Sequence, residues 1–253
     1  MRYNKAKQRM LEGHPALGVG VGLDSPLSAE LLSLVGFDFV LVDAQHGLID
    51  DGGALAAFRS TLMGSAVPMA RVRQNDFYAI GRLLDRGALG IVVPLVNSAA
   101  EAEAAAYAMR YPPRGGRSMG NLGALFYGPD YLDWIDHEVF LAVQIESAQA
   151  VDCAEEILAV PGVDGCWVGP ADLTASMGVD PQTAAGREAR DQAILRVAEA
   201  CRTTGKIPGI WTSGPEDAAR WIDEGFLFVT AADDSSLLVS GGQQALANLG
   251  RAP

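Results

Sequence analysis

The sequence Phe39-Val40-Leu41-Val42-Asp43 is a short apolar run, rich in β-branched residues, that ends in a carboxylate. Similar runs recur along the chain, separated by longer stretches in which apolar residues follow helical spacing. Continuous rather than alternating apolar runs are typical of parallel strands that are covered on both faces. We expect eight strand–helix pairs, with strands at residues 17–23, 39–42, 67–72, 91–96, 140–145, 165–168, 207–211 and 226–230.

Eight such units in 253 residues predict an α/β fold, a single (β/α)8 TIM barrel domain that takes in residues 1–253. A doubly wound open sheet is the alternative, but it usually carries a glycine-rich turn after its first strand. Gly18, Gly20 and Gly22 instead lie inside the expected first strand, which argues against a dinucleotide-binding turn. Residues 114–138 break the alternation, and a loop-like insertion of this length is usually functional or lies at an interface.

The balance of charges disfavours two classes of partner. Acidic residues outnumber basic residues by 31 to 19, which gives a net charge of −12. Binding to nucleic acid or to an anionic membrane surface requires a dense basic face, so we expect neither. Residues 1–13 lack the apolar stretch of a signal peptide, and no apolar run is long enough to span a membrane. Three widely spaced cysteines form no disulfide or zinc pattern, which fits reduced thiols in a cytoplasmic protein.

Catalytic groups of a (β/α)8 barrel lie at the carboxyl-terminal ends of its strands. Glu146 follows the expected fifth strand, and Asp172 lies just beyond the sixth. Two carboxylates that converge on one point would suit Mg²⁺ or Mn²⁺, which takes one or two carboxylates and leaves other positions to water and substrate. Each acid could instead serve only as a cap or first-turn residue of the helix that follows it.

Other polar residues stand at equivalent positions. Arg71 lies at the end of the expected third strand, and its planar guanidinium matches a carboxylate or an enolate in a bidentate manner. It could also form no more than a salt bridge at the rim. His46 follows the second strand beside Asp43, where it could relay a proton near neutral pH or simply be a hydrogen-bonded loop residue. The small residues at 169–172 would let backbone N–H groups approach an anion.

These residues belong to an ordered set of motifs: Asp43-x-Gln45-His46-Gly47, Arg71, Leu83-Leu84-Asp85-x-Gly87-Ala88, Pro112-Pro113-Arg114-Gly115, Gln144-Ile145-Glu146 and Gly169-Pro170-Ala171-Asp172-Leu173. The set resembles the HpcH/HpaI family of class II pyruvate aldolases, of the 4-hydroxy-2-oxoheptanedioate aldolase type, over residues 18–233. The resemblance implies a carbon–carbon lyase that cleaves 4-hydroxy-2-oxo acids reversibly to pyruvate and an aldehyde. The reaction would pass through a pyruvate enolate that a divalent metal stabilises.

The resemblance also implies a role for each matched residue. Glu146 and Asp172 would bind Mg²⁺, Mn²⁺ or Co²⁺, and Arg71 would stabilise the enolate oxygen. His46, paired with Asp85 across a subunit boundary, would act as a base or position a water molecule. The backbone amides at the start of the motif 169–172 would receive the pyruvate carboxylate. The expected substrate contacts are Arg71, Gln144, Gly169, Pro170, Ala171, Asp172 and Trp211.

Asp43 and Gln144 would order the water bound to the metal, and Gln45 would lie just outside that water, although many family members have glutamate where Gln45 stands. Close relatives also carry a tryptophan in the first strand that walls the pyruvate pocket, and this chain has Gly20 there. The lost bulk could enlarge the pocket. Trp211, at the end of the seventh strand, could refill that space or could be ordinary barrel packing.

Members of the family usually form hexamers in which the last helix is swapped between subunits. This implies a homo-oligomer, a trimer or a hexamer, and we expect a short last helix at residues 243–249 that could dock on a neighbour. The same metal-enolate chemistry would also serve a lyase or decarboxylase of oxaloacetate-like 2-oxo acids. A catalytically idle scaffold or a small-acid-binding protein would require a broken site, whereas the ionisable positions of the motifs are intact.

Overall fold

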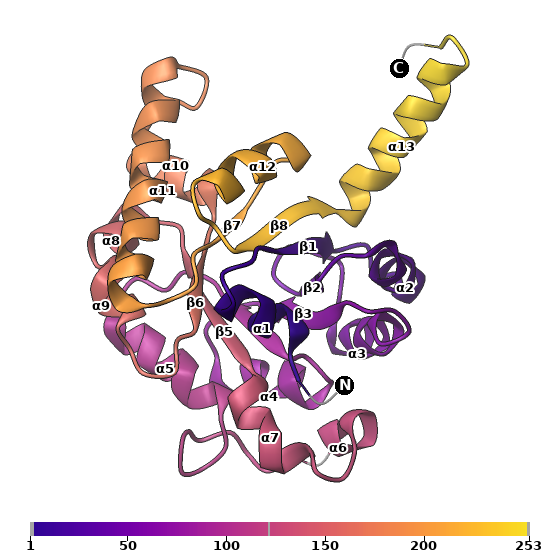
Figure 1. The fold of residues 1–253 in the computed structure, drawn as a ribbon, viewed down its shortest axis with the longest axis vertical. Helices are drawn as coiled ribbons and strands as arrows, with labels where there is room; N and C mark the ends of the chain where they lie inside the picture. The colour runs from indigo at the N-terminus through magenta and orange to yellow at the C-terminus, as the bar shows by residue number, and fades with distance from the viewer. Residues whose placement is uncertain (1–2, 121, 252–253) are drawn as a thin grey trace.

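The computed structural model describes residues 3–120 and 122–251. Its eight parallel strands pair in sequence order, and β1 also pairs with β8, so the sheet closes into a barrel. This arrangement confirms the predicted (β/α)8 fold (Figure 1). The strands are β1 (Ala16–Val21), β2 (Phe39–Asp43), β3 (Val67–Arg71), β4 (Gly90–Val93), β5 (Phe140–Ile145), β6 (Gly165–Val168), β7 (Gly209–Trp211) and β8 (Phe228–Asp233).

Helices surround the barrel and return the chain from the end of one strand to the start of the next (Figure 1). Their starts follow from the local sequence, because Ser25, Asp50, Asp76 and Ser98 each accept a hydrogen bond from a first-turn N–H group. The helices that follow the first six strands are α2 (Pro26–Val35), α3 (Asp51–Thr61), α4 (Phe77–Asp85), α5 (Ala99–Met109), α8 (Ala148–Asp152), α9 (Ala154–Leu158), α10 (Pro170–Met177) and α11 (Ala184–Thr204). Helix α1 (Lys5–Leu11) precedes β1, and α12 (Pro215–Asp223) precedes β8.

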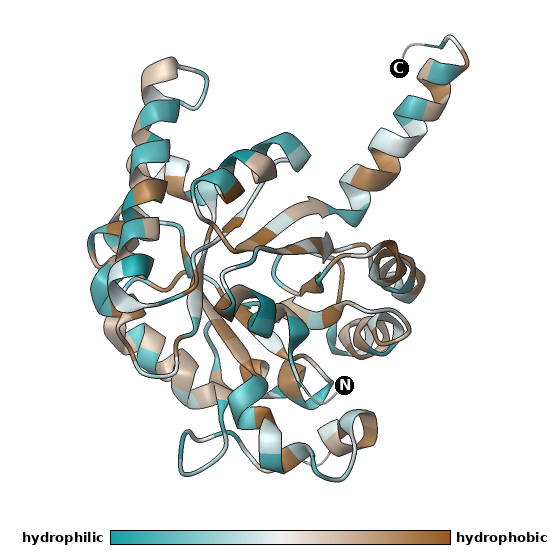
Figure 2. Ribbon diagram, viewed as in Figure 1, coloured by the Kyte–Doolittle hydropathy of each residue, from teal (hydrophilic) through white to brown (hydrophobic). Residues whose placement is uncertain are grey.

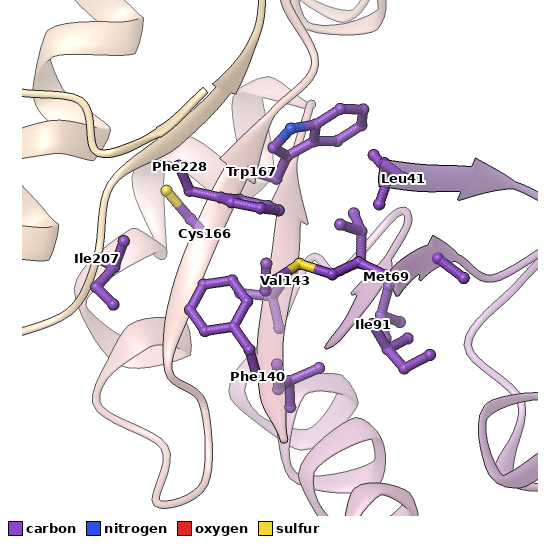
Figure 3. Packing of buried hydrophobic residues seen from close by; sticks show 14 of the residues in the cluster. Leu41, Met69, Ile91, Phe140, Val143, Cys166, Trp167, Ile207 and Phe228 are labelled. Atoms are coloured by element: carbon purple, nitrogen blue, oxygen red, sulfur yellow. The ribbon is translucent and has the colours of Figure 1, made fainter. Parts of the chain in front are cut away.

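Large side chains, among them Phe140, Trp167 and Phe228, pack in the interior of the barrel (Figure 3). Glycines on neighbouring strands make room for two of the phenylalanine rings. The ring centroid of Phe228 lies 4.6 Å from that of Phe39 and 5.0 Å from that of Phe140. A Cβ atom at Gly18 would stand 2.0 Å from the Phe39 ring, and one at Gly209 would stand 2.8 Å from the Phe228 ring. Gly18 in the first strand therefore serves interior packing rather than phosphate binding.

The last helix is longer than the sequence predicted. Helix α13 (Asp234–Asn248) begins nine residues before the expected position of 243, because Asp233 and Ser236 form a capping box at its start. Serine and glycine are weak helix formers, so Ser235, Ser236 and the pair Gly241-Gly242 give little local sign of a helix here. In Figure 1 the helix projects away from the barrel toward the carboxyl terminus.

The insertion at residues 114–138 is also more ordered than a loop. It contains helices α6 (Leu122–Tyr127) and α7 (Tyr131–Glu138), which lie together at one side of the barrel (Figure 1). An aromatic cluster holds them together, since the rings of Tyr127 and Tyr131 stack with centroids 5.9 Å apart. The spacing of Tyr127, Tyr131 and Trp134, at intervals of four and three residues, is a helical signal that the sequence reading passed over.

The segments that follow β5 and β6 are also helical. The chain after β5 forms α8 and α9, which divide at Cys153, and α10 begins directly after β6. Within residues 3–120 and 122–251, no helix has the combination of length and apolar character needed to cross a bilayer.

The packing of Gly18 against Phe39 yields a stability prediction. We expect Gly18→Ala to lower the free energy of unfolding by about 1–3 kcal/mol, because the added methyl group would displace a buried ring. Gly81→Ala in α4 is the control, since no atom lies within 4 Å of the added Cβ and alanine favours helix by about 1 kcal/mol. Urea unfolding measures both variants, and an equally stable Gly18→Ala would contradict this account of the interior.

Candidate active site at the carboxyl-terminal end of the barrel

Most of the site residues predicted from the sequence meet at one end of the barrel. Asp43 ends β2, Arg71 ends β3, Glu146 follows β5, and Asp172 lies in the first turn of α10 after β6. Because all strands are parallel, their carboxyl-terminal ends form a single rim. A cavity of about 380 Å³ opens there, and its polar and aromatic lining includes Asp43, His46, Arg71, Trp167, Trp211 and Asp233.

Arg71 is fixed on two sides. Its Nε atom donates a hydrogen bond of 3.0 Å to Oδ1 of Asp43, and its Nη2 atom donates to Oδ2. The guanidinium carbon also lies 5.2 Å from the ring centroid of Trp167, which is in range for a cation–π contact. Trp167 is held in turn, since its indole N–H donates to the hydroxyl of Thr230 at 3.2 Å. These contacts orient Arg71 before any substrate binds.

Asp43 is held in its charged form. Burial raises the pKa of this carboxyl group, but the hydrogen bond and charge of Arg71 and the N–H groups of His46 and Gln45 outweigh that effect and leave the pKa below its ordinary value. Oδ1 of Asp43 accepts from the backbone N of Gln45 at 3.0 Å and from that of His46 at 3.2 Å. Asp43 therefore shapes the loop that carries His46 as well as holding Arg71.

The pKa of Glu146 is shifted in the opposite direction to that of Asp43. Burial raises its pKa to about 7, and the charge of Asp172 and a hydrogen bond with it add to the rise, which Leu95 and Arg71 oppose. Its Oε1 atom accepts from the backbone N of Leu95 at 2.8 Å, and its Oε2 atom accepts from the side-chain amide of Gln144. Glu146 and Asp172 are therefore close enough to repel each other when both are charged, which a bound cation would relieve.

The surrounding groups fit a hard divalent cation. The side-chain oxygens of Gln144 and Gln45 are both buried and accept no hydrogen bond from the described residues. No cluster of three or more His, Cys, Asp or Glu side chains that could hold a metal exists in residues 3–120 and 122–251. Two carboxylates with nearby amide oxygens are a donor set that suits Mg²⁺ or Mn²⁺, which retain several water ligands.

The motif from Gly169 to Asp172 starts helix α10. Gly169 is its N-cap residue and makes no side-chain cap, and Pro170 follows in the first turn. A Cβ at Gly169 would stand 2.8 Å from Oε2 of Glu146, so only glycine lets the helix start this close to the carboxylate. The first N–H groups of a helix, here those of Ala171 and Asp172, have no intrahelical partner and attract anions.

Trp211 fills the space that Gly20 leaves open. Its ring atoms would lie 3.2 Å from a Cβ atom at Gly20. Its ring centroid lies 5.8 Å from that of Trp167, with the two planes at 80°. Trp211 of β7 therefore occupies the space that a side chain at position 20 of β1 would take.

Within one chain, Asp85 does not meet His46. His46 lines the cavity, whereas Asp85 ends α4, the helix that returns the chain to the start of β4. There Oδ1 of Asp85 accepts from Nη2 of Arg117 at 2.7 Å. The pairing of His46 with an Asp85 from another subunit stays a prediction.

Sequence reasoning missed two residues of the site. Leu95 has a φ of 56°, a conformation that residues other than glycine rarely adopt, and it presents its N–H to Glu146. Any residue type has that N–H, so the sequence carries no signal for it. Trp167 stood in an apolar strand, and nothing in the sequence showed that its ring forms the surface beneath Arg71.

Comparisons with known proteins agree with the motifs. Residues 17–241 match the family described as HpcH/HpaI aldolase/citrate lyase. The chain is 37% identical to a hydroxypyruvate/pyruvate aldolase of Rhizorhabdus wittichii, over 97% of this chain and 98% of that protein. It is 36% identical to a 4-hydroxy-2-oxo-heptane-1,7-dioate aldolase of Escherichia coli, over 98% and 95% of the two chains.

A solved structure shows the same fold. The HpcH/HpaI aldolase/citrate lyase family protein from Burkholderia cenocepacia superimposes with a TM-score of 0.90 at 30% identity. The match covers 98% of this chain and 100% of that one. A family match over most of the chain, with relatives above 30% identity along its length, leaves one conclusion. The chain belongs to the HpcH/HpaI aldolase/citrate lyase family.

Proposed function

We propose that this protein is a metal-dependent aldolase, a carbon–carbon lyase that reversibly cleaves 4-hydroxy-2-oxo acids into pyruvate and an aldehyde. The observation that carries the proposal is the placement of a preorganised Arg71 on the same rim as the paired acids Glu146 and Asp172. The names of the Rhizorhabdus and Escherichia relatives support the same reaction class.

Each residue has a task in the proposed reaction. Glu146 and Asp172 hold the divalent cation, which is Mg²⁺, Mn²⁺ or Co²⁺. When bound, it supplies the Lewis acidity that stabilises negative charge on the oxygen of the 2-oxo group. The free N–H groups of Ala171 and Asp172 bind the carboxylate of the 2-oxo acid. Gln144, whose amide already contacts Glu146, orients that carboxylate and water near it.

Arg71 and His46 handle the developing charge and the proton. Two nitrogens of Arg71 bind Asp43, which leaves Nη1 to donate to the oxygen that becomes the enolate. His46 takes the proton of the C4 hydroxyl, directly or through a water molecule, as the C3–C4 bond breaks. The electron pair of that bond moves into the enolate, the aldehyde leaves, and protonation at C3 gives pyruvate.

Arg71 provides a direct test of this assignment. We expect Arg71→Lys to lower kcat/KM about 10²- to 10³-fold, because lysine keeps the charge but loses the fork that holds Asp43 and reaches the enolate. Pyruvate release is measured with a lactate dehydrogenase assay, and circular dichroism checks the fold. Arg73→Lys, two residues further along, serves as the matched control and should stay close to wild type. Comparable activity in Arg71→Lys and wild type would refute the role of Arg71.

Metal removal and pH form a second test. EDTA should abolish pyruvate release, and Mn²⁺ or Mg²⁺ should restore it. Because Glu146 has a pKa of about 7 without metal, metal affinity should be highest above pH 7. It should weaken as the pH falls through that value, by up to about tenfold per pH unit, since the proton competes with the metal. Calorimetric titration with Mn²⁺ at several pH values measures the effect.

The stability of the metal-free protein depends on pH in the opposite direction to its affinity for metal. A carboxyl group whose pKa rises from 4.5 to about 7 on folding binds more protons in the folded state across that range. The metal-free protein should therefore lose stability as the pH rises from 4.5 through 7, and added metal should reverse the loss. Undiminished turnover in EDTA would contradict the proposed function.

We also propose that the protein forms a homo-oligomer in which α13 docks on a neighbouring subunit. Helix α13 exposes Leu238 and Val239, and helix α2 exposes Leu27, Leu31 and Leu34. Figure 2 shows hydrophobic residues along both helices, and α13 lies apart from the barrel. Apolar faces of this kind are normally covered by another element.

Substitution on either helix tests the docking. We expect Leu31→Asp and Leu238→Asp each to shift the protein to a smaller oligomer or a monomer, because a charge would be buried in the contact. Light scattering after gel filtration gives the mass. Leu11→Asp, on the exposed surface of α1, is the control and should leave the mass unchanged. A monomeric wild-type protein would refute this proposal without touching the aldolase assignment.

A further inference from the structure

One corner of the candidate cavity is both aromatic and acidic. Asp233 ends β8, and its Cβ atom would lie 3.5 Å from a Cβ atom at Gly20 on β1. Trp211 of β7 closes the same corner, with ring atoms 3.2 Å from that position. Since β7, β8 and β1 are neighbours in the closed barrel, Trp211, Asp233 and Gly20 form one continuous wall, here called the β8 wall.

The β8 wall belongs to the same cavity as Arg71 and His46, the residues proposed to handle the enolate and the C4 hydroxyl. Of its three strands, β1 lies opposite β5, which Glu146 follows, and β7 is the neighbour of β6, which Asp172 follows. Trp167 of β6 also lines the cavity, beneath the guanidinium of Arg71. In the proposed reaction the C4 hydroxyl lies at His46, so the aldehyde part of the substrate occupies the cavity that the β8 wall closes.

The cavity is negatively charged at that end. Asp43, Asp233 and Asp234 line it, and Arg71 is the only arginine or lysine among its described lining residues. Arg71 is already bound to Asp43, so it does not offset the other two charges. Asp234 is buried and accepts from the N–H groups of Gly22 and Leu23.

Asp233 is charged as well. Burial raises the pKa of its carboxyl group, but hydrogen bonds from Ser235 and Ser236 together outweigh that effect. The pKa of Asp233 therefore lies below its ordinary value. Oδ1 of Asp233 accepts from the backbone N of Ser236 at 2.9 Å, which fixes the carboxylate at the start of α13. The carboxylate therefore stands at the cavity in one orientation and remains ionised at neutral pH.

We propose that the aldehyde partner of this enzyme is uncharged, and that Asp233 makes the site select against aldehydes that carry a carboxylate. This inference rests on the proposed aldolase function and names the substrate class of that site. A carboxylate at the far end of the aldehyde would meet like charge in a partly desolvated corner, which is unfavourable. A neutral aldehyde avoids that repulsion, and any hydroxyl group it carries can donate to Asp233.

Two aldehydes of equal length test the proposal. Butanal and succinic semialdehyde both have four carbons and differ in that a carboxylate replaces the terminal methyl group. We measure kcat/KM for aldol addition of pyruvate to each in the presence of Mn²⁺. For the wild type, the ratio of kcat/KM for the semialdehyde to that for butanal should be below about 0.1, as expected for unrelieved like-charge contact.

Asp233→Asn removes the charge and keeps the cap, because asparagine is as good an N-cap residue as aspartate. We expect this variant to raise the ratio about tenfold, in line with the removal of one nearby like charge. Asp76→Asn is the matched control, since it makes the same change at the N-cap of α4 and Asp76 does not line the cavity. It should leave the ratio unchanged.

The outcomes separate this inference from the proposed function. Exchange of the pyruvate methyl protons in D₂O needs enolate formation but no aldehyde, so it reports on the aldolase function alone. Suppose that metal-dependent exchange is observed. A wild-type preference for the semialdehyde would then overturn the inference about Asp233, and so would an unchanged kcat/KM ratio in Asp233→Asn. Absence of metal-dependent exchange would overturn the proposed function, and this inference with it.

Discussion

The packing of aromatic rings against glycines inside the barrel is the constraint on which the site depends. Phe39 and Phe228 can meet in the interior because Gly18 and Gly209 leave room beside them. That packing closes eight strands into one barrel, and closure places their ends on a common rim. Trp167 lies at this rim with its indole N–H fixed by Thr230, and Arg71 rests over its ring. The orientation of the most important cation of the site is therefore a consequence of how the core is filled.

Two carboxyl groups of the site, those of Asp43 and Glu146, have pKa values shifted in opposite directions. Asp43 faces Arg71 and two backbone N–H groups, so its pKa is lowered and it stays charged. Glu146 faces another acid, and burial and that neighbour raise its pKa to about 7. The first carboxylate is suited to hold a guanidinium in place, and the second to exchange a proton for a metal ion. A net charge of −12 is thus compatible with an anionic substrate, because Arg71 lies at the rim and the proposed function adds a cation at Glu146 and Asp172.

Much of this could be predicted from the sequence, and the failures have identifiable causes. The strands are buried on both faces, so their apolar runs were easy to recognise, and the acids that follow them led directly to the rim. Helix α13 was placed too late because its large apolar residues are exposed and the pair Gly241-Gly242 interrupts its helical pattern. The helices of the insertion were missed because they are short and are separated by Gly128-Pro129, although Tyr127, Tyr131 and Trp134 have helical spacing and their rings pack together.

The sequence by itself determined the barrel class, the family and the identity of the ionisable groups, because each depends on residue type and order along the chain. Only the tertiary structure decided how those groups are paired. It joined Arg71 to Asp43, gave Glu146 the N–H of Leu95, and kept Asp85 with Arg117 away from His46. It also placed Trp211 against Gly20 and Asp233 in the same wall. Such pairings arise from the closure of strands distant in sequence, and no local pattern encodes the distances that result.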